Sequence, residues 1–300
     1  MKKHILSEDK LFTYIAMAIL VVLSVFMVAP LVLVVSASLT DESSLLTHGY
    51  QFIPSKVSFA AYQYLWQQKS MILRSYGVTV LVTVFGTCVS VLLTMLMAYP
   101  ISRRDYIFRN IFTFVIFFTM LFSGGFVSSY MVWTRIFHVK NTLAALILPN
   151  YLMNAFNVIL VKNYYTNSIP TELIEAAKID GASEMTVFSK VMVPLSTPVL
   201  TTIALFCGVA YWNDWMNGLY YITDENLYSI QTLLNRLLNN INFLKSGNAF
   251  GAMGSAAAMN MPSMSIRMAI AVVAVIPLLL VFPFLQKSLI KGVVIGAVKG

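Results

Sequence analysis

Six long apolar stretches constrain what this chain can fold into. A membrane-spanning helix needs about 20 mainly apolar residues to cross the hydrocarbon layer. The chain is 58% hydrophobic and only 11% charged, so it has too few polar groups to cover a water-soluble globule. The sequence therefore predicts an all-α integral membrane protein, one domain over residues 1–300 with six transmembrane helices. The expected spans are roughly 12–38, 77–100, 110–132, 142–161, 197–222 and 266–287.

The basic residues predict how the spans are oriented. An even number of spans places both termini on one side. With that side in the cytoplasm, the inner segments hold twelve of the 20 lysines and arginines, although the outer segments are longer in total. This bias follows the positive-inside rule. The first apolar stretch is longer than a signal-peptide core, so we expect a retained span in a plasma-membrane protein.

A polar, charged segment at residues 170–194 interrupts the apolar sequence on the expected cytoplasmic side. Pro170 suits the first turn of a helix, where its missing N–H is not needed, and Glu172 places negative charge at the positive helix end. Gly181 permits the left-handed turn that ends this helix. A second short helix should begin at Ser183.

One side of the first helix carries Leu173, Ala176 and Ala177, at i, i+3 and i+4. Alanine buries little surface, but it allows another protein to approach the backbone closely. We therefore interpret this side as a docking surface.

The spacing Glu-Ala-Ala, three residues, Gly, nine residues, Val-x-Val-Pro, at residues 175–194, resembles the cytoplasmic signature of permease subunits of ABC importers. It departs from the usual form only at Val191 and Val193, where Ile and Leu are commoner. The resemblance implies the type I, maltose-permease-like importer fold and a helix that fits a cleft on an ATPase subunit. The implied ATPase-coupling residues are Leu173, Glu175, Ala176, Ala177, Asp180, Gly181 and Ala182.

The extreme C-terminus, Val298-Lys299-Gly300, ends a flexible basic stretch that is either a solvated tail or a further ATPase contact. It resembles the tail of maltose-type permeases, which implies the contact. By the same resemblance, the chain would pair with a second homologous permease, two ATP-binding subunits that hold ATP and Mg²⁺, and an extracellular substrate-binding lipoprotein. The transported substrate would be an oligosaccharide, carried by alternating access in a Gram-positive bacterium.

Three asparagines, Asn150, Asn154 and Asn157, share a face of the expected fourth span at i, i+4 and i+7. Amides that faced lipid would lack hydrogen-bond partners, so this face must meet protein or water. Two interpretations stay open: hydrogen bonds between helices, or a hydrophilic passage for sugar hydroxyls.

A cluster of aromatic and polar residues lies toward the outer end of the expected fifth span. Aromatic faces that stack on sugar rings, beside side chains that bond hydroxyls, suit an oligosaccharide site. The alternative is an aromatic belt at the membrane surface with one solvated acid. Permeases for oligosaccharides have a similar aromatic-Trp-Asn segment here. The candidate substrate-pathway residues are Tyr211, Trp212, Asn213, Asp214, Trp215 and Asn217.

Ser123-Gly124-Gly125 interrupts the third expected span. Small residues at this point permit either close helix packing or a bend that lines the pathway.

The sequence contains no motif that would provide the energy for transport. It contains no Gly-x-x-x-x-Gly-Lys-Ser/Thr loop for ATP phosphates, and no deep ionisable pairs for a proton relay. We therefore expect a permease without cofactors, driven by a partner ATPase. The alternatives are an ion-coupled sugar carrier, or a membrane enzyme acting on lipid-linked sugars. An enzyme needs a clustered acid, base or metal site, and Asp214 stands alone, so we expect no enzyme.

Overall fold

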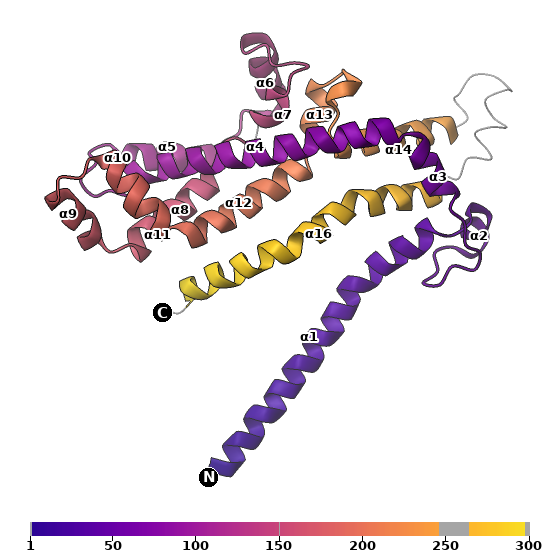
Figure 1. Ribbon diagram of the computed structural model, residues 1–300, viewed down its shortest axis with the longest axis horizontal. Coiled ribbons are helices and arrows are strands. Elements are labelled where there is room, and N and C mark those ends of the chain that lie inside the picture. The colour runs from indigo at the N-terminus through magenta and orange to yellow at the C-terminus, as the bar shows by residue number, and fades with distance from the viewer. Residues whose placement is uncertain (1, 150, 246–263, 298–300) are drawn as a thin grey trace. The chain divides into compact units, whose positions relative to one another are not determined.

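The computed structural model describes residues 2–149, 151–245 and 264–297, which are almost entirely helical (Figure 1). The chain divides into two compact units, where the sequence predicted one domain. The first comprises Met1–Lys69 with Leu237–Pro277, and the second comprises Ser70–Arg236 with Leu278–Gly300. Each unit is described by itself.

The first unit begins with three helices, α1 (Lys2–Ser38), α2 (Glu42–His48) and α3 (Ala60–Gln67), and includes the start of α16 (Met264–Ala297). The carboxylate of Glu42 in α2 caps α16. It accepts hydrogen bonds from the backbone N–H groups of Met264 at 3.0 Å and Ser265 at 3.1 Å. A carboxylate is stabilising there because it pairs with free N–H groups at the positive end of the helix.

The second unit contains the longest run of packed helices. In Figure 1, α4, α5, α8 and α12 run beside one another, with α9 at one end. The elements are α4 (Lys69–Ser102), α5 (Arg109–Leu121), α6 (Gly125–Met131), η1 (Val132–Ile136), α7 (Ala144–Ile147), α8 (Ala155–Ser168), α9 (Thr171–Ile179), α10 (Glu184–Val187), η2 (Phe188–Met192), α11 (Val193–Leu195), α12 (Thr197–Trp212), α13 (Met216–Tyr221), η3 (Glu225–Leu227) and the start of α14 (Ile230–Lys245), whose residues from Leu237 onward belong to the first unit.

Helix α4 packs through a stripe of mostly small side chains. The buried residues recur every three or four positions, so they lie on one side of the helix. Small residues let membrane helices approach closely and bury little polar surface. The stripe consists of Ser75, Thr79, Val82, Gly86, Ser90, Thr94, Ala98 and Ile101.

Within the described residues, two unbroken helices are long and apolar enough to cross a membrane, 10–38 and 69–102. Two bent pairs could add one span each. The first, 109–121 with 125–136, bends by 115°, and the second, 184–195 with 197–212, bends by 79°. The Ser123-Gly124-Gly125 segment therefore forms a bend, and that this bend lines the pathway stays a prediction. The total of six spans stays a prediction.

Three predicted spans are not continuous helices, and the first of them, 110–132, is broken by the bend after Leu121. The prediction of one helix over 142–161 is wrong, because α7 ends at Ile147 and α8 begins at Ala155. Pro149 lies between them, where its ring removes a backbone donor and disfavours helical geometry before it. The helix predicted over 197–222 breaks after Trp212 and resumes at Met216.

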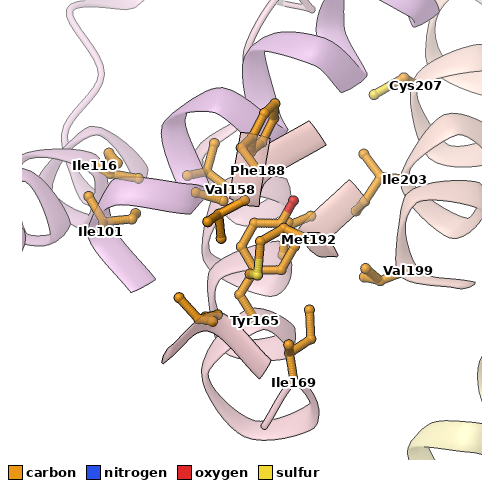
Figure 2. Close-up of a cluster of buried hydrophobic side chains, with 14 residues drawn as sticks. Ile101, Ile116, Val158, Tyr165, Ile169, Phe188, Met192, Val199, Ile203 and Cys207 are labelled. Carbon is orange, nitrogen blue, oxygen red and sulfur yellow. The ribbon is translucent and has the colours of Figure 1, made fainter. Parts of the chain in front are cut away.

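One hydrophobic cluster joins the segment 170–194 to the bundle (Figure 2). It contains Ile101 from α4, Ile116 from α5, Val158 from α8 and Ile203 from α12. Ile174 of α9, with Val187, Phe188 and Met192 of the next two elements, completes it. The segment 170–194 is therefore anchored in the core of its own chain.

Candidate functional site

Helix α9 forms where local signals place it. Its N-cap is Pro170, with extended backbone, and Glu172 lies in its first turn. Gly181 ends it with φ +80°, in the left-handed region, and its N–H donates to the carbonyl of Lys178 at 3.0 Å. The Oγ of Ser183 then caps α10 by accepting from the N–H of Thr186 at 3.3 Å. The predicted bounds of the first helix and the predicted start of the second are confirmed.

The faces of α9 differ from the prediction in one respect. Ile174 is buried, and Ala177 and Ala182 are half-buried against the chain's own core. Ala177 therefore does not share an exposed side with Leu173 and Ala176. It lies three residues after Ile174, and this i, i+3 spacing turns it inward.

Three large apolar side chains of this segment are exposed. Leu173 is exposed, Ile179 is 86% exposed and Met185 of α10 is 66% exposed. We call these three residues the exposed edge. Glu175, Ala176, Asp180 and Gly181 are exposed around it. An apolar group with a polar rim is typical of a protein interaction site.

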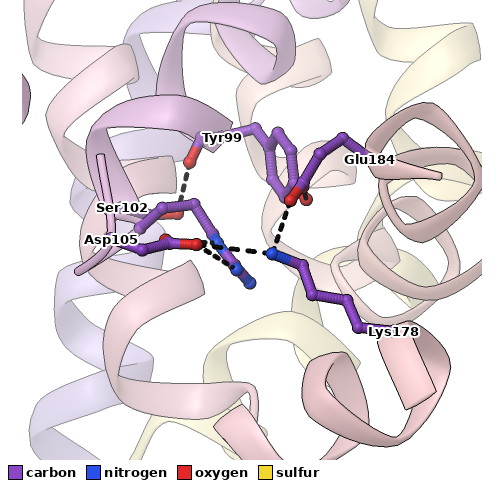
Figure 3. A network of polar contacts seen from close by, with 6 residues as sticks. Tyr99, Ser102, Asp105, Lys178 and Glu184 are labelled. Atoms are coloured by element: carbon purple, nitrogen blue, oxygen red, sulfur yellow. Dashed lines mark hydrogen bonds and ion pairs between the residues drawn. The ribbon is translucent and has the colours of Figure 1, made fainter. Parts of the chain in front are cut away.

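A closed set of polar contacts ties α9 and α10 to the end of α4 (Figure 3). Lys178 Nζ lies 2.6 Å from Glu184 Oε1 and 3.3 Å from Asp105 Oδ2. Arg103 donates two hydrogen bonds to the Asp105 carboxylate, at 2.9 and 3.0 Å. Tyr99 donates its hydroxyl to Glu184 Oε2 at 2.5 Å. These five residues, Tyr99, Arg103, Asp105, Lys178 and Glu184, are the Lys178 network.

The two cations and two carboxylates of the network balance each other's charge. The hydrogen bonds from Arg103 hold the pKa of Asp105 at about 2, well below its ordinary value. Lys178, and then Tyr99, lower the pKa of Glu184, and Glu184 in turn raises that of Lys178. All four charged groups are therefore ionised at neutral pH.

A first cavity of about 360 Å³ lies between α8 and α12. Asn154 and Asn157 line it with three aromatic side chains, Tyr151, Phe156 and Phe206, and with Cys207 and Ala210. Asn154 is the N-cap of α8, since its Oδ1 accepts from the N–H of Phe156 at 2.9 Å. Asn157 donates to Cys207 Sγ at 3.5 Å. Amides beside aromatic faces can bind a sugar.

A second cavity of about 600 Å³ lies at the bend after α5. Its lining combines hydroxyl groups, backbone of two glycines and aromatic rings. The lining residues are Ser123, Gly124, Gly125, Phe126, Ser128, Ser129, Val132, Trp133 and Met216. Neither cavity has a charged residue in its lining, and no group of three or more His, Cys, Asp or Glu among the described residues could hold a metal ion.

Residues 90–295, more than two thirds of the chain, match the family of binding-protein-dependent transport system inner membrane components. The chain belongs to this family. It is therefore a transport permease and not an enzyme, as the Glu-Ala-Ala segment predicted.

Relatives of this permease cover nearly its whole length. It is 39% identical to the polygalacturonan/rhamnogalacturonan transport system permease protein YtcP of Bacillus subtilis, over 98% of this chain and 100% of that one. It is 38% identical to protein LplC of the same organism, over 91% of this chain and 90% of that one. A crystal structure of a bacterial ABC transporter that imports the acidic polysaccharide alginate superposes with a TM-score of 0.76. That match is 29% identical and covers 93% of this chain and 97% of the other, which confirms the importer permease fold.

The asparagines of the permease do not form the predicted helical stripe. Asn154 has extended backbone and begins α8 instead of continuing a helix, so its relation to Asn157 is that of a cap to the first turn. The two amides still meet, because both line the first cavity. Asn150 lies outside the described residues.

The aromatic and polar cluster after Val209 divides between buried and exposed positions. Tyr211 is buried and donates to the carbonyl of Ile147 at 2.9 Å. Asp214 is buried and accepts from the N–H of Asn217 at 3.1 Å, which caps α13. Asn217 donates to the carbonyl of Pro149 at 3.1 Å. These three side chains hold the broken helices together.

The other members of this cluster lie closer to the surface. Trp212 is half-buried, with its ring 6.4 Å from that of Tyr76, and Asn213 and Trp215 are exposed. None of the six residues lines either cavity. A substrate contact by any of them stays a prediction.

Several functional features escaped sequence reasoning. The Lys178 network includes two contacts between residues 73 and 85 positions apart, and only the opposite charges of Lys178 and Asp105 could have indicated one of them. The cavity residues Phe206 and Cys207 read as plain apolar sequence. Helix α14 occupies 230–245, a stretch outside the six expected spans. The predicted tail contact, Val298, Lys299 and Gly300, lies outside the described residues.

Proposed function

We propose that this permease forms the membrane channel of an ATP-driven importer and takes up an oligosaccharide by alternating access. The observation that carries this proposal is the exposed edge of Leu173, Ile179 and Met185 on a segment anchored in the permease core. An ATPase cleft that covers these side chains would bury apolar surface at roughly 25 cal/mol per Å². Its movement would then reach the bundle through Ile174.

The complete importer would contain a second homologous permease, two ATP-binding subunits and an extracellular binding lipoprotein. Glu175, Asp180 and Gly181, exposed around the edge, would contact the ATPase together with Leu173 and Ala176. The segment would lie in the cytoplasm, as would both termini. The basic residues of the inner segments support this orientation.

The proposed substrates are oligosaccharides that contain uronic acids. The names of the relatives support this class, since polygalacturonan is a uronic acid polymer and alginate is an acidic polysaccharide. The serine, asparagine and aromatic linings of the two cavities suit sugar hydroxyls and ring faces. Neither lining carries a basic residue, so we assign selection of the acidic groups to the external binding protein.

Reconstitution tests both parts of this proposal. The permease, its partner permease, the ATPases and the binding protein are placed in proteoliposomes, and labelled oligogalacturonides are compared with neutral oligosaccharides of equal length. We expect uptake only with hydrolysable ATP on the cytoplasmic side, insensitive to ionophores, and larger for the acidic sugars. Uptake without ATP that an ionophore abolishes would indicate an ion-coupled carrier instead. Equal or greater uptake of the neutral sugars would refute the substrate class.

A further inference from the structure

The attachment of α9 to its own chain depends on few groups. Ile174 is its only buried side chain, and Ala177 adds a small half-buried surface. A helix of nine residues held by one large side chain can rotate about that point unless other contacts fix it. The Lys178 network supplies such contacts.

The network fixes α9 because it reaches the end of α4 at two points and spans three parts of the chain. From Lys178 of α9, one arm runs through Glu184 of α10 to Tyr99 of α4. The other arm runs through Asp105 to Arg103, directly after α4. Both arms therefore end on the same helix end, four residues apart, and together they resist rotation in two directions.

Tyr99 also connects the network to the hydrophobic cluster. Its ring lies 5.4 Å from that of Phe188, and its hydroxyl binds Glu184. The side chain of Arg103 is only 14% exposed, so this end of the network is held in place by packing. The carboxylates are over half exposed, and single exposed ion pairs contribute little to stability. The network therefore fixes the position of α9 more than it adds to the stability of the fold.

Lys178 is poorly placed to bind a partner. Its ammonium group is shared between two carboxylates of its own chain, at 2.6 and 3.3 Å. A partner's acidic group would have to displace one of them. The charge of Lys178 is thus directed inward, while the exposed edge beside it faces outward.

We propose that the Lys178 network is the link that makes α9 and the end of α4 move as one body. Its members are positioning residues: they hold the docking helix at a fixed angle to α4, so that a displacement of α9 reaches the bundle. This inference rests on the proposed function, because it assigns a role within the same coupling segment.

The test uses the complete importer in proteoliposomes and nanodiscs. The variants are Lys178→Gln, Asp105→Asn, the double variant, and Lys178→Arg, which keeps the charge. Lys190→Gln is the matched control, since Lys190 is exposed on the same segment outside the network. Three quantities are measured: assembly with the ATPase, sugar transported per ATP hydrolysed, and hydrogen exchange of the backbone amides of residues 172–182.

We expect Lys178→Gln and Asp105→Asn each to lower the sugar transported per ATP at least fivefold and to speed amide exchange in 172–182, with assembly retained. The double variant should be no worse than the single ones, since both break the same closed network. Lys178→Arg and Lys190→Gln should behave as wild type. An unchanged transport ratio in Lys178→Gln, an equal fall in Lys190→Gln, or a fall caused by lost assembly would each overturn the proposal.

The two proposals fail in different ways. If wild-type importer takes up no sugar with ATP, the proposed function fails. Hydrogen exchange of residues 172–182 then tests the role of the network independently of transport. Faster exchange in Lys178→Gln but not in Lys190→Gln supports that role, and equal exchange in the two variants overturns it.

Discussion

The aromatic ring of Tyr211 lies directly on the backbone of Gly86. A Cβ atom at position 86 would come within 2.6 to 2.9 Å of three ring atoms, closer than any real contact allows. The hydroxyl of Tyr211 donates a hydrogen bond to the carbonyl of Ile147. One buried tyrosine therefore fixes α12 against α4 and against α7, and it can do so only because position 86 has no side chain.

Replacing Gly86 with alanine should destabilise the permease by about 1–3 kcal/mol, the usual cost of overpacking. The ring cannot move aside without losing its hydrogen bond to Ile147. Thermal unfolding of the purified protein in detergent measures the effect. The matched control is Gly77→Ala on the same helix, where an added Cβ meets nothing within 4 Å. That change should be neutral or stabilising, because alanine favours helix more than glycine does. Equal melting temperatures for the two variants would contradict the packing argument.

Gly181 should tolerate side chains in the order expected for left-handed backbone. Its φ of +80° suits glycine, is accepted by asparagine, and strains a β-branched residue. We expect near-normal ATP-driven uptake in Gly181→Asn and a loss of at least tenfold in Gly181→Val, with both proteins inserted normally in the membrane. No atom lies within 4 Å of an added Cβ, so backbone strain is the cause that separates the two variants. Full uptake in Gly181→Val would show that the turn is not required.

The bounds of α9 and the start of α10 could be predicted because their signals are local. Pro170, Gly181 and Ser183 each act on the turn that contains them. The break at 148–154 could not be found in the same way. An apolar run and a single proline are compatible with a kinked span, and the asparagines fit a helical face as well as they fit a cap. Asn154 became a cap because α8 begins immediately after it.

Contacts between distant segments were beyond sequence reasoning altogether. The small residues on α4 are separated by apolar ones, so they resemble ordinary spanning sequence until Tyr211 is placed against Gly86. In the same way, Tyr99 gives no local sign that its hydroxyl binds Glu184. Hydropathy identified where helices form, and tertiary packing decided where they break and meet.

Asn154 offers a way to separate a structural role from a substrate contact. Replacing it with alanine removes the cap of α8 and should cost about 0.5–2 kcal/mol, whereas serine keeps a capping oxygen. If the amide also binds sugar in the first cavity, Asn154→Ser should keep the melting temperature and lose at least fivefold in apparent affinity for the oligosaccharide. Measuring melting temperature and uptake on both variants distinguishes the roles. Normal affinity in Asn154→Ser would remove this residue from the pathway.

The Lys178 network should be insensitive to pH between about 5 and 9. The pKa of Asp105 is depressed to about 2 by Arg103. The contribution of its ionised carboxylate to folding stability is therefore complete above its ordinary pKa of 3.8, and it is lost only as the pH falls through 2. The pKa of Glu184 is also lowered, mainly by Lys178. The pKa of Lys178 is raised above 10.5, so the contribution of its ammonium group to folding stability is lost only at higher pH. The difference in melting temperature between wild type and Asp105→Asn should therefore stay constant from pH 5 to 9. A difference that titrates within this range would mean that the network is not fully ionised at neutral pH.

Ile179 should contribute to ATPase binding and not to the stability of the permease. It is 86% exposed, so Ile179→Asp should change the stability of the permease by less than about 0.5 kcal/mol. Burial of an isoleucine side chain contributes about 1.5–3 kcal/mol, so the same change should weaken ATPase binding roughly 10- to 100-fold. Binding of purified ATPase to the permease in nanodiscs measures this.

Ile53→Asp is the matched control, because Ile53 is 81% exposed on the side predicted to lie outside the cell. It should leave ATPase affinity unchanged, since a partner in the cytoplasm cannot reach it. Equal affinities for the two variants would place the ATPase contact away from the exposed edge, because only a contact that covers Ile179 can distinguish them.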